Sequence, residues 1–460
     1  MDPAPNEELA GLIAEAGVTH RGLAKEIRDL AVAQDLDVRC THVDIGRWLA
    51  GRTPRGAKPD LIAQVLGKHL GRPLTHADIG LTTRPGPPLD LGLRFEPSPA
   101  AVLRTGRALW KEDLSRAGFI RRGAVTAAML TVPMARWLLA SPADSPERTG
   151  RALHVGPSDV EAILATVRMF EDLDHRFGGG HARTAAVQYL HSAVAPMLNG
   201  SYTARVGRDL FAAAAQSTYK AGAMAYDVGR HGLARRYFVQ ALNLAHGSGD
   251  RALGGKVLAL MSHQANFLGE YLEAVDLARA AKLGARGHAT PTVHAMYCAM
   301  EARALASQGN HRECVKAMRE AEIEFDRRNP SDDPEWIAYF DEAELHDEFA
   351  HCFRGLCETQ EADRHATMSL RASGDAYPRS RTFCRLTLAG AYIDVRRPRD
   401  RDIERACAIA GEAVATAGRL KSGRVRAYLK DLDRRLAEFG TAKPVRELRR
   451  QMAGAHEATN

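Results

Sequence analysis

Residues 41–55, THVDIGRWLAGRTPR, combine an apolar helical face with side chains that can bind nucleic acid. Ile45, Trp48 and Leu49 recur at helical spacing, which predicts that they pack into a core. The opposite face carries side chains able to hydrogen-bond to the edges of bases: Thr41, His42, Asp44 and Arg47. A short helix with one buried face and a polar tip is suited to the major groove of DNA, where Arg47 is the natural partner of guanine.

A basic region surrounds this helix. Residues 39–72 hold seven Lys or Arg against two Asp or Glu, a local excess of five positive charges, which suits a phosphate backbone. Phosphate contacts position a protein without specifying a sequence, and we expect them from four residues: Arg21, Arg52, Arg55 and Lys58. The alternative is a small helical bundle whose basic edge simply faces solvent.

Short helices must position these side chains. Apolar residues at helical spacing predict four of them: 6–16, 19–30, 41–50 and 59–70. Thr75 and Asp78 have the spacing of a capping box for one further turn. Residues 1–83 are therefore predicted to form one small helical domain.

The chain changes character after residue 83. Residues 84–99 contain five prolines and two glycines, a density that predicts a linker or an ordered strap rather than a helix. Residues 100–183 are predicted to be a helical connecting region. Residues 453–460 are predicted to be a disordered tail.

An internal repeat occupies the rest of the chain. Three segments begin with glycines forty residues apart, at Gly229, Gly269 and Gly309, and carry small or apolar residues at their sixth, tenth and thirteenth positions. Another helical segment precedes each of them, weaker copies follow, and a helix pair over 184–215 is predicted to lead the array. Helix pairs that recur in this way predict an α-solenoid over residues 184–452.

The composition favours an all-helical protein, with 45 % hydrophobic and 6 % aromatic residues and few segments of period two. We expect a soluble, cytoplasmic protein without a membrane segment, because no run of about 18 apolar residues and no signal pattern is present. The seven cysteines are scattered and never form C-x-x-C, so they are interpreted as reduced core residues. One exposed redox-sensing thiol is the alternative.

Three further patterns are interpreted as structural. In HDEFAH (346–351) the histidines are five residues apart and do not share a helical face, which disfavours a metal site. GDRALGGKV (249–257) lacks the first glycine and the Ser/Thr of a P-loop. The acidic segment 320–363 is interpreted as a solvated face rather than a cation site. We expect no cofactor, no metal and no enzymatic activity.

The Gly-x-x-x-x-Ala-x-x-x-(Phe/Ala)-x-x-Ala pattern resembles the second helix of a tetratricopeptide repeat, with a period longer than the usual 34 residues. This resemblance implies that the first helix of each pair faces the concave surface. Counting back from the opening glycines gives the inward polar, aromatic and charged residues that we predict to bind a ligand: Tyr219, Tyr226, Lys256, His263, Asn266, Arg303, Glu344, Asp347, His351 and Arg354. Such a surface suits a peptide or a small amphipathic signal, and the alternative is that these residues hold the helices together.

The N-terminal residues resemble the helix-turn-helix of phage-repressor-like (Xre-type) regulators. Thr19-His20-Arg21-Gly22-Leu23-Ala24 stands where that family opens its second helix, and residues 41–45 with Trp48-Leu49-Ala50-Gly51 match its recognition helix. The resemblance implies that Thr19, His20 and Arg21 lie at the DNA. His20 replaces the usual glutamine, and residues 28–40 exceed the usual turn.

The whole chain resembles a group of actinomycete regulators with an N-terminal helix-turn-helix and C-terminal repeats. FGGGHAR (177–183), RYFVQAL (236–242), MSHQANFLG (261–269) and WIAYFDEAEL (336–345) carry this resemblance. It implies a transcription factor, most simply a homodimeric repressor of sporulation or antibiotic production that binds a palindromic operator in double-stranded DNA. The alternative is a repeat-based interaction scaffold with weak or vestigial DNA binding.

Overall fold

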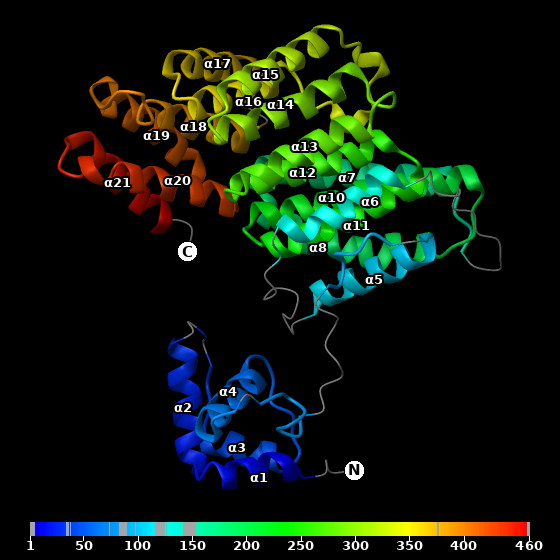
Figure 1. Ribbon diagram of the computed structural model, residues 1–460, viewed down its shortest axis with the longest axis vertical. Coiled ribbons are helices and arrows are strands. Elements are labelled where there is room, and N and C mark those ends of the chain that lie inside the picture. Colours follow the sequence, from blue (N-terminus) through cyan, green and yellow to red (C-terminus); the bar gives the residue numbers. More distant parts are fainter. Residues whose placement is uncertain are drawn as a thin grey trace. The chain divides into compact units, whose positions relative to one another are not determined.

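The computed structural model describes most of the chain: residues 5–33, 36, 38–72, 74–81, 90–96, 98–115, 125, 127–140, 153–374 and 377–457. It divides into two compact units, one of Met1–Pro88 with Ser115–Arg122 and one of Leu89–Leu114 with Gly123–Asn460. Helices make up both units and no β-strand occurs among the described residues, so the predicted all-α class is confirmed (Figure 1). No described helix is both long enough and apolar enough to cross a membrane.

Among its described residues, the first unit has four helices: α1 (Glu7–Glu15), α2 (His20–Ala33), α3 (His42–Leu49) and α4 (Lys58–Leu70). Side chains cap the starts of α1, α2 and α3, as Asn6 does for α1 by accepting the amide of Leu9, whereas α4 begins with a proline in its first turn and has no side-chain cap. Thr75 and Asp78 form the predicted capping box, with 3.2 Å from the amide of Asp78 to the Thr75 hydroxyl and 2.6 Å from the amide of Thr75 to the Asp78 carboxylate. Local sequence therefore accounts for most boundaries in this unit.

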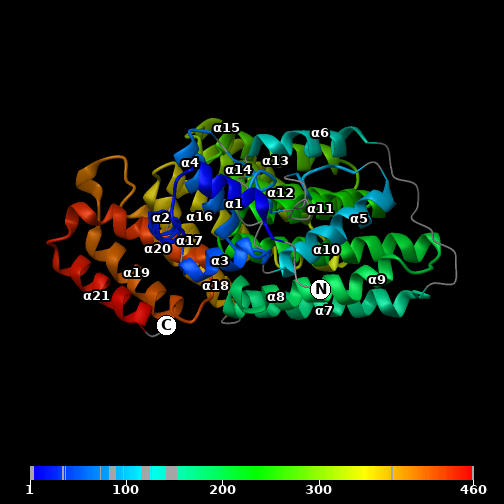
Figure 2. The ribbon, with the colours of Figure 1, turned by 90° about the horizontal axis from the view of Figure 1, so that it is seen from below.

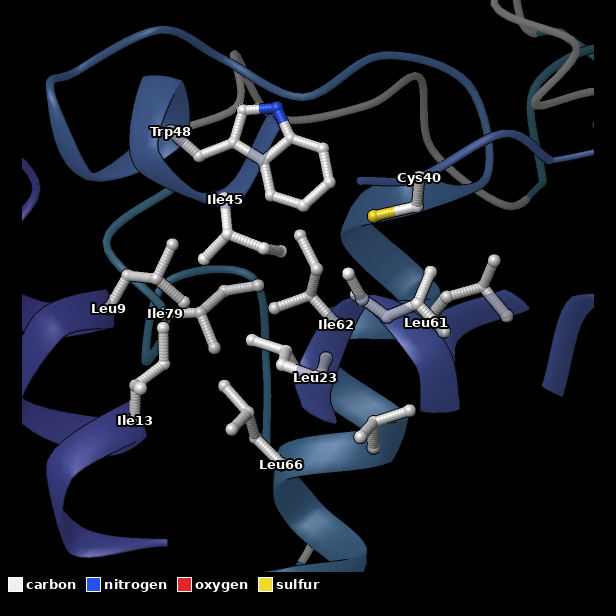
Figure 3. Packing of buried hydrophobic residues seen from close by; sticks show 14 of the residues in the cluster. Leu9, Ile13, Leu23, Cys40, Ile45, Trp48, Leu61, Ile62, Leu66 and Ile79 are labelled. Atoms are coloured by element: carbon white, nitrogen blue, oxygen red, sulfur yellow. The ribbon is translucent and has the colours of Figure 1, made fainter. Parts of the chain in front are cut away.

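The core of the first unit holds α3 in place (Figure 3). Ile45 and Trp48 of α3 are 0 % and 5 % exposed, which confirms that the tryptophan belongs to the core. They pack with apolar side chains of the other helices, including Leu9, Leu23 and Ile62. Burying such side chains stabilises the unit by about 1.5–3 kcal/mol each, so the outer face of α3 is presented by a rigid support.

Six consecutive helix pairs build most of the described part of the second unit (Figures 1 and 2). In the first five pairs the two helices pack on each other, whereas the last helix of the sixth pair packs on the second helix of the fifth. Their first helices are α10 (Ala204–Asp227), α12 (Arg251–Phe267), α14 (Pro291–Ser307), α16 (Glu342–Gly355), α18 (Pro378–Ala391) and α20 (Gly423–Arg435). Their second helices are α11 (His231–Ser248), α13 (Tyr271–Gly284), α15 (His311–Asp326), α17 (Thr359–Ala372), α19 (Ile403–Ala417) and α21 (Lys443–Glu457). The predicted helical solenoid is thus confirmed. The predicted leading pair over 184–215 is instead α8 (Gly179–Tyr189), a π-turn, α9 (Ala195–Leu198) and the start of α10.

The turn inside each of the first three pairs requires a left-handed residue. Gly229, Gly269 and Gly309 have φ angles of 84°, 82° and 72°, which glycine adopts without a steric penalty. In the fourth pair Cys357 takes the corresponding position at φ 57°, and no other described non-glycine residue has a positive φ. This substitution explains why the fourth copy is weak in the sequence.

The proline-rich segment is an ordered strap where the structure describes it. Residues 90–96 lie along α11, whose Gln240 and Asn243 side chains donate to the carbonyls of Gly92 (3.1 Å) and Arg94 (2.9 Å). Leu93 and Phe95 are buried. Helices α5 (Pro99–Leu114) and α6 (Thr131–Leu139) then pack on α11 as well.

The array closes on itself through α7 (Pro157–Phe177), which contacts both α10 and α18. The amide of Lys421 donates to the carbonyl of Phe177 (2.7 Å), and the amide of Gly180 donates to the carbonyl of Lys421 (3.0 Å). The glycine run after α7 makes this approach possible, because a Cβ on Gly180 would lie 2.8 Å from the Lys421 carbonyl oxygen. The last helix pair therefore meets the start of the unit and encloses its centre.

Candidate functional site

The outer face of α3 is the first candidate site. His42 and Arg47 are exposed, as DNA contact would require. Thr41 and Asp44 instead satisfy each other in a capping box: the Thr41 hydroxyl and amide both donate to Asp44 Oδ2 at 2.9 Å. These hydrogen bonds hold the pKa of the Asp44 carboxyl below its usual value. Thr41 and Asp44 thus fix the start of the helix, a role that the sequence interpretation had not assigned to them.

The predicted phosphate-binding residues surround α3 and the start of α2. Thr19, His20 and Arg21 are exposed at the N-terminus of α2, where the Thr19 hydroxyl accepts the amide of Gly22 (3.1 Å). Arg52 and Arg55 are exposed in the connection from α3 to α4. The Lys58 ammonium lies 5.8 Å from the centre of the Trp48 ring, on the border of the core. The first unit therefore presents a set of cations next to α3.

The second candidate site is a cavity of about 440 Å³ inside the second unit. It is lined by the first helix of every pair, by α7, and by the segment between α15 and α16. Eight of the ten residues predicted from the repeat register line it: Tyr219, Tyr226, Lys256, His263, Arg303, Glu344, Asp347 and His351. The register therefore brings side chains from four helices to one enclosed space.

Asn266 and Arg354, the other two predicted residues, are not among the residues that line the cavity. Each belongs to the last turn of its helix, α12 or α16, beyond the region that faces the cavity. The Arg354 guanidinium donates to Asp394 Oδ2 from two nitrogens, both at 3.1 Å, so it holds neighbouring pairs together. The structure therefore places Arg354 outside the cavity that the other predicted residues line.

Several lining residues come from elements without a repeat register. Asp174 and His175 belong to α7, and Trp336 and Tyr339 belong to the connection between α15 and α16. Arg424 belongs to α20, which lies in a copy of the repeat whose sequence is too dissimilar to align with the first three copies. The glycine spacing used for the prediction contains no signal for these positions.

A buried ion-pair network forms one wall of the cavity. Asp174 accepts from the Arg379 guanidinium at 2.6 Å and lies 3.4 Å from the Lys220 ammonium. Both cations hold the pKa of Asp174 far below its usual value, against the effect of burial. Burial, with Lys220 and Arg379 nearby, lowers the pKa of His175 to about 3, so this histidine is neutral at physiological pH.

Lys256 lies among aromatic rings on a second wall. Its ammonium is 4.7 Å from the ring centre of Tyr219, 4.8 Å from that of Trp336 and 5.7 Å from that of Tyr339. It donates to the carbonyl of Trp336 at 3.0 Å. Burial lowers the pKa of Lys256 to about 8, and the ring faces partly offset the lost hydration of its charge.

Arg303 and α16 form a third wall. One guanidinium nitrogen of Arg303 donates to both carboxylate oxygens of Glu348 at 2.9 Å. A second nitrogen of Arg303 lies 3.3 Å from the His351 ring nitrogens and 3.3 Å from the Tyr428 hydroxyl. Burial and the adjacent guanidinium hold the pKa of His351 well below its usual value. Neutral His351 therefore serves this network as a polar, uncharged partner.

The motifs interpreted as structural have local partners. His346 Nδ1 lies 3.1 Å from His365 Nδ1, whereas His351 faces Arg303, so the two histidines of HDEFAH do not converge. The glycines of 249–257 make room for aromatic rings: a Cβ on Gly254 would lie 2.6 Å from the Trp137 ring. These contacts explain both patterns without a metal or a nucleotide.

One described trio could hold a metal ion: His294, Cys298 and Glu320 have ligand atoms within 4.8 Å of one another. The Lys282 ammonium donates to Glu320 at 2.7 Å and to Glu301 at 3.0 Å. An internal cation already neutralises these carboxylates. All seven cysteines are free, and all but the half-buried Cys357 are buried, in agreement with the prediction of reduced core residues.

Comparison with known families gives one result for the first unit. The family model described as the SP15 N-terminal domain matches residues 9–82, a segment that includes most of α1 and all of α2, α3 and α4. A search of curated proteins gives no match to the chain.

Proposed function

We propose that this protein is a sequence-specific DNA-binding transcriptional regulator whose repeat unit binds a signal. The observation that carries the proposal is α3, a helix fixed by a capping box and a buried tryptophan while His42 and Arg47 remain exposed beside Arg52 and Arg55. A rigid helix with exposed polar side chains and cationic flanks fits major-groove binding. The resemblance to Xre-type regulators supports the same role.

In this proposal, Arg47 and His42 read base edges, and the surrounding cations hold phosphates. We expect a homodimer that places two copies of α3 about 34 Å apart on a palindromic operator. The role as a repressor of development or secondary metabolism rests on the resemblance to actinomycete regulators.

The cavity supplies the regulatory part of the proposal. A ligand that binds one arrangement of the helix pairs better than another shifts the population between them, and thereby changes operator affinity. The cavity volume of about 440 Å³ lies within the range of small-molecule sites.

The alternative is an interaction scaffold whose repeats recruit proteins while the first unit binds DNA weakly. The two proposals are separated by incubating the full-length protein with fragments of its own genome at several salt concentrations and sequencing what is retained. Arg47→Ala is the test variant, and Arg312→Ala, an exposed position in the second unit, is the control that loses the same charge. A palindromic motif lost in Arg47→Ala and kept in Arg312→Ala supports the regulator, whereas uniform recovery in all samples supports the scaffold.

A further inference from the structure

The charges that line the cavity are not evenly paired. Four acidic residues pair with three of its cations: Asp174 and Glu171 with Lys220, Asp174 and Asp227 with Arg379, and Glu348 with Arg303. Another lining cation, Arg168, pairs with Glu335 at 2.7 Å. Lys256 uses a carbonyl and aromatic rings rather than a close carboxylate. Among the described residues, no Lys or Arg lies within ion-pair distance of the other two carboxyls of α16 that line the cavity, those of Glu344 and Asp347.

Glu344 and Asp347 are one helical turn apart, so they share the face of α16 that lines the cavity. Asp347 is 9 % exposed, and its Oδ1 atom has no hydrogen-bond partner. Its nearest basic group is His351, 3.8 Å from Oδ2 and neutral. The carboxyl also has a side-chain hydrogen bond with Cys384, so Oδ1 is the acceptor left unsatisfied. A buried carboxylate oxygen without a partner destabilises the fold unless something else satisfies it.

The neighbouring wall suits an ammonium ion. Tyr219, Trp336 and Tyr339 already surround the charge of Lys256, at ring-centre distances of 4.7 to 5.7 Å. The same cavity is also lined by Tyr377 and Phe383. Aromatic faces and unpaired carboxylates together stabilise a cation more strongly than either does alone.

From this geometry we infer that the cavity binds a small organic cation, an amine with a flat apolar body, whose charged nitrogen is held by Glu344 and Asp347. The inference names the ligand class for the signal site of the proposed function and rests on that proposal. The apolar body lies against the aromatic walls, and the ammonium protons occupy the free acceptor positions of the two carboxylates.

Binding must be linked to protonation. Burial and the repulsion of Glu348 raise the pKa of Asp347 to about 7, and burial and Asp347 raise the pKa of Glu344 well above its usual value. The other groups that face Asp347 are Arg303 on α14, Cys384 on α18 and Arg424 on α20. A bound cation favours the ionised carboxylates, so binding releases protons and strengthens as pH rises through about 7.

Three probes of similar shape test the inference: tryptamine (cation), tryptophol (neutral) and indole-3-acetate (anion). We expect tryptamine to raise the melting temperature of the full-length protein and to bind calorimetrically with a heat that depends on the ionisation enthalpy of the buffer. Indole-3-acetate tests the opposite charge preference, because an anion would bind the guanidinium of Arg424. This guanidinium stacks on Tyr226 and Phe383, and its Nε atom has no hydrogen-bond partner.

The variant Glu344→Gln/Asp347→Asn keeps the shape of both side chains and removes their charge. We expect it to bind tryptamine at least roughly tenfold more weakly. The control is Asp276→Asn, an exposed residue of α13 outside the cavity lining, which should bind tryptamine unchanged. Since the double variant removes unpaired carboxyls, it should melt at or above the temperature of the parent protein, so loss of binding cannot be ascribed to unfolding.

Preference for tryptophol or indole-3-acetate, or no stabilisation by the amine, would overturn the inference. Equal loss of binding in Asp276→Asn and in the double variant would also overturn it, because the effect would then be one of general charge. These measurements contain no DNA. If the protein binds the amine but retains no genomic fragments, the assignment of the cavity stands. The proposed role as a transcriptional regulator is then refuted.

Discussion

Ser422 donates a hydrogen bond to Asp227, 195 residues earlier in the chain, with 2.9 Å between Oγ and Oδ1. Asp227 is the last residue of α10, and Ser422 is the N-cap of α20, so the bond joins the first and last pairs of the array. Asp227 Oδ2 accepts the amide of Gly179 at 2.9 Å as well. One buried carboxylate thus holds three elements at the closure of the cavity.

We predict that Ser422→Ala lowers the free energy of unfolding by about 1–2 kcal/mol, through the lost cap and the carboxylate left without its donor. Chemical denaturation checks this value. Ser192→Ala, at an exposed helical position, is the control and should change stability by less than about 0.5 kcal/mol. A double-mutant cycle with Asp227→Asn isolates the closure, and zero coupling energy would contradict it.

Measurements of DNA binding should distinguish Arg47, which is proposed to contact a base, from Arg52, which is proposed to contact a phosphate. We predict that Arg47→Ala lowers the discrimination between operator and random DNA by about 1–3 kcal/mol, because a base contact is lost. Arg52→Ala should weaken binding to operator DNA and to random DNA equally. It should also reduce the number of counterions released on binding by about one, as expected when a phosphate contact is lost. Titrations at several salt concentrations measure both quantities, and identical behaviour of the two variants would refute the assignment.

Cys357 should be replaceable by glycine with a gain in stability. Its φ of 57° costs an L-residue about 1 kcal/mol, and glycine avoids that cost although it loses more entropy on folding. We expect Cys357→Gly to raise the free energy of unfolding by up to about 1 kcal/mol. Cys357→Ala removes the thiol but keeps Cβ, so an equal gain in that control would assign the effect to the thiol.

The stability of the ligand-free protein should depend on Asp347 and pH. The pKa of this carboxyl is raised to about 7 in the folded state, so the folded protein binds the proton more tightly than the unfolded chain does. Its contribution to stability therefore falls as pH rises from about 4 to about 7 and then stays constant. Asp347→Asn should be more stable than the parent by about 1–3 kcal/mol at pH 8 and nearly equal to it at pH 4. An unchanged difference across this range would contradict the assignment.

The solenoid was predictable because its turns require particular residues. Glycine at 229, 269 and 309 marks a left-handed turn, and small residues at fixed positions after it mark close helix packing. The same register placed eight of ten predicted side chains around one cavity. It failed at Asn266 and Arg354, since a register gives the face of a helix but not where along the helix the cavity ends.

Other features depend on contacts that no local pattern encodes. The sequence shows that α7 is helical, but its position beside α10 and α18 depends on distant packing. The acidic segment 320–363 was interpreted as a solvated face, whereas Glu344, Asp347 and Glu348 line the cavity. The Thr41–Asp44 capping box was visible in the spacing, yet these residues had been assigned to base contacts because both functions use the same polar side chains.

The strap on α11 has a consequence for how the sequence can diverge. Gln240 and Asn243 bind carbonyl oxygens of residues 90–96, and every amino acid supplies such an oxygen. The helix thus recognises the path of the strap and not its side chains. Mutations should accumulate freely at Asp90 and Arg94, whereas Gly92 is constrained by its φ of 81° and Leu93 and Phe95 by burial. Homologues should therefore keep these three positions and diverge at the exposed ones while the strap follows the same path.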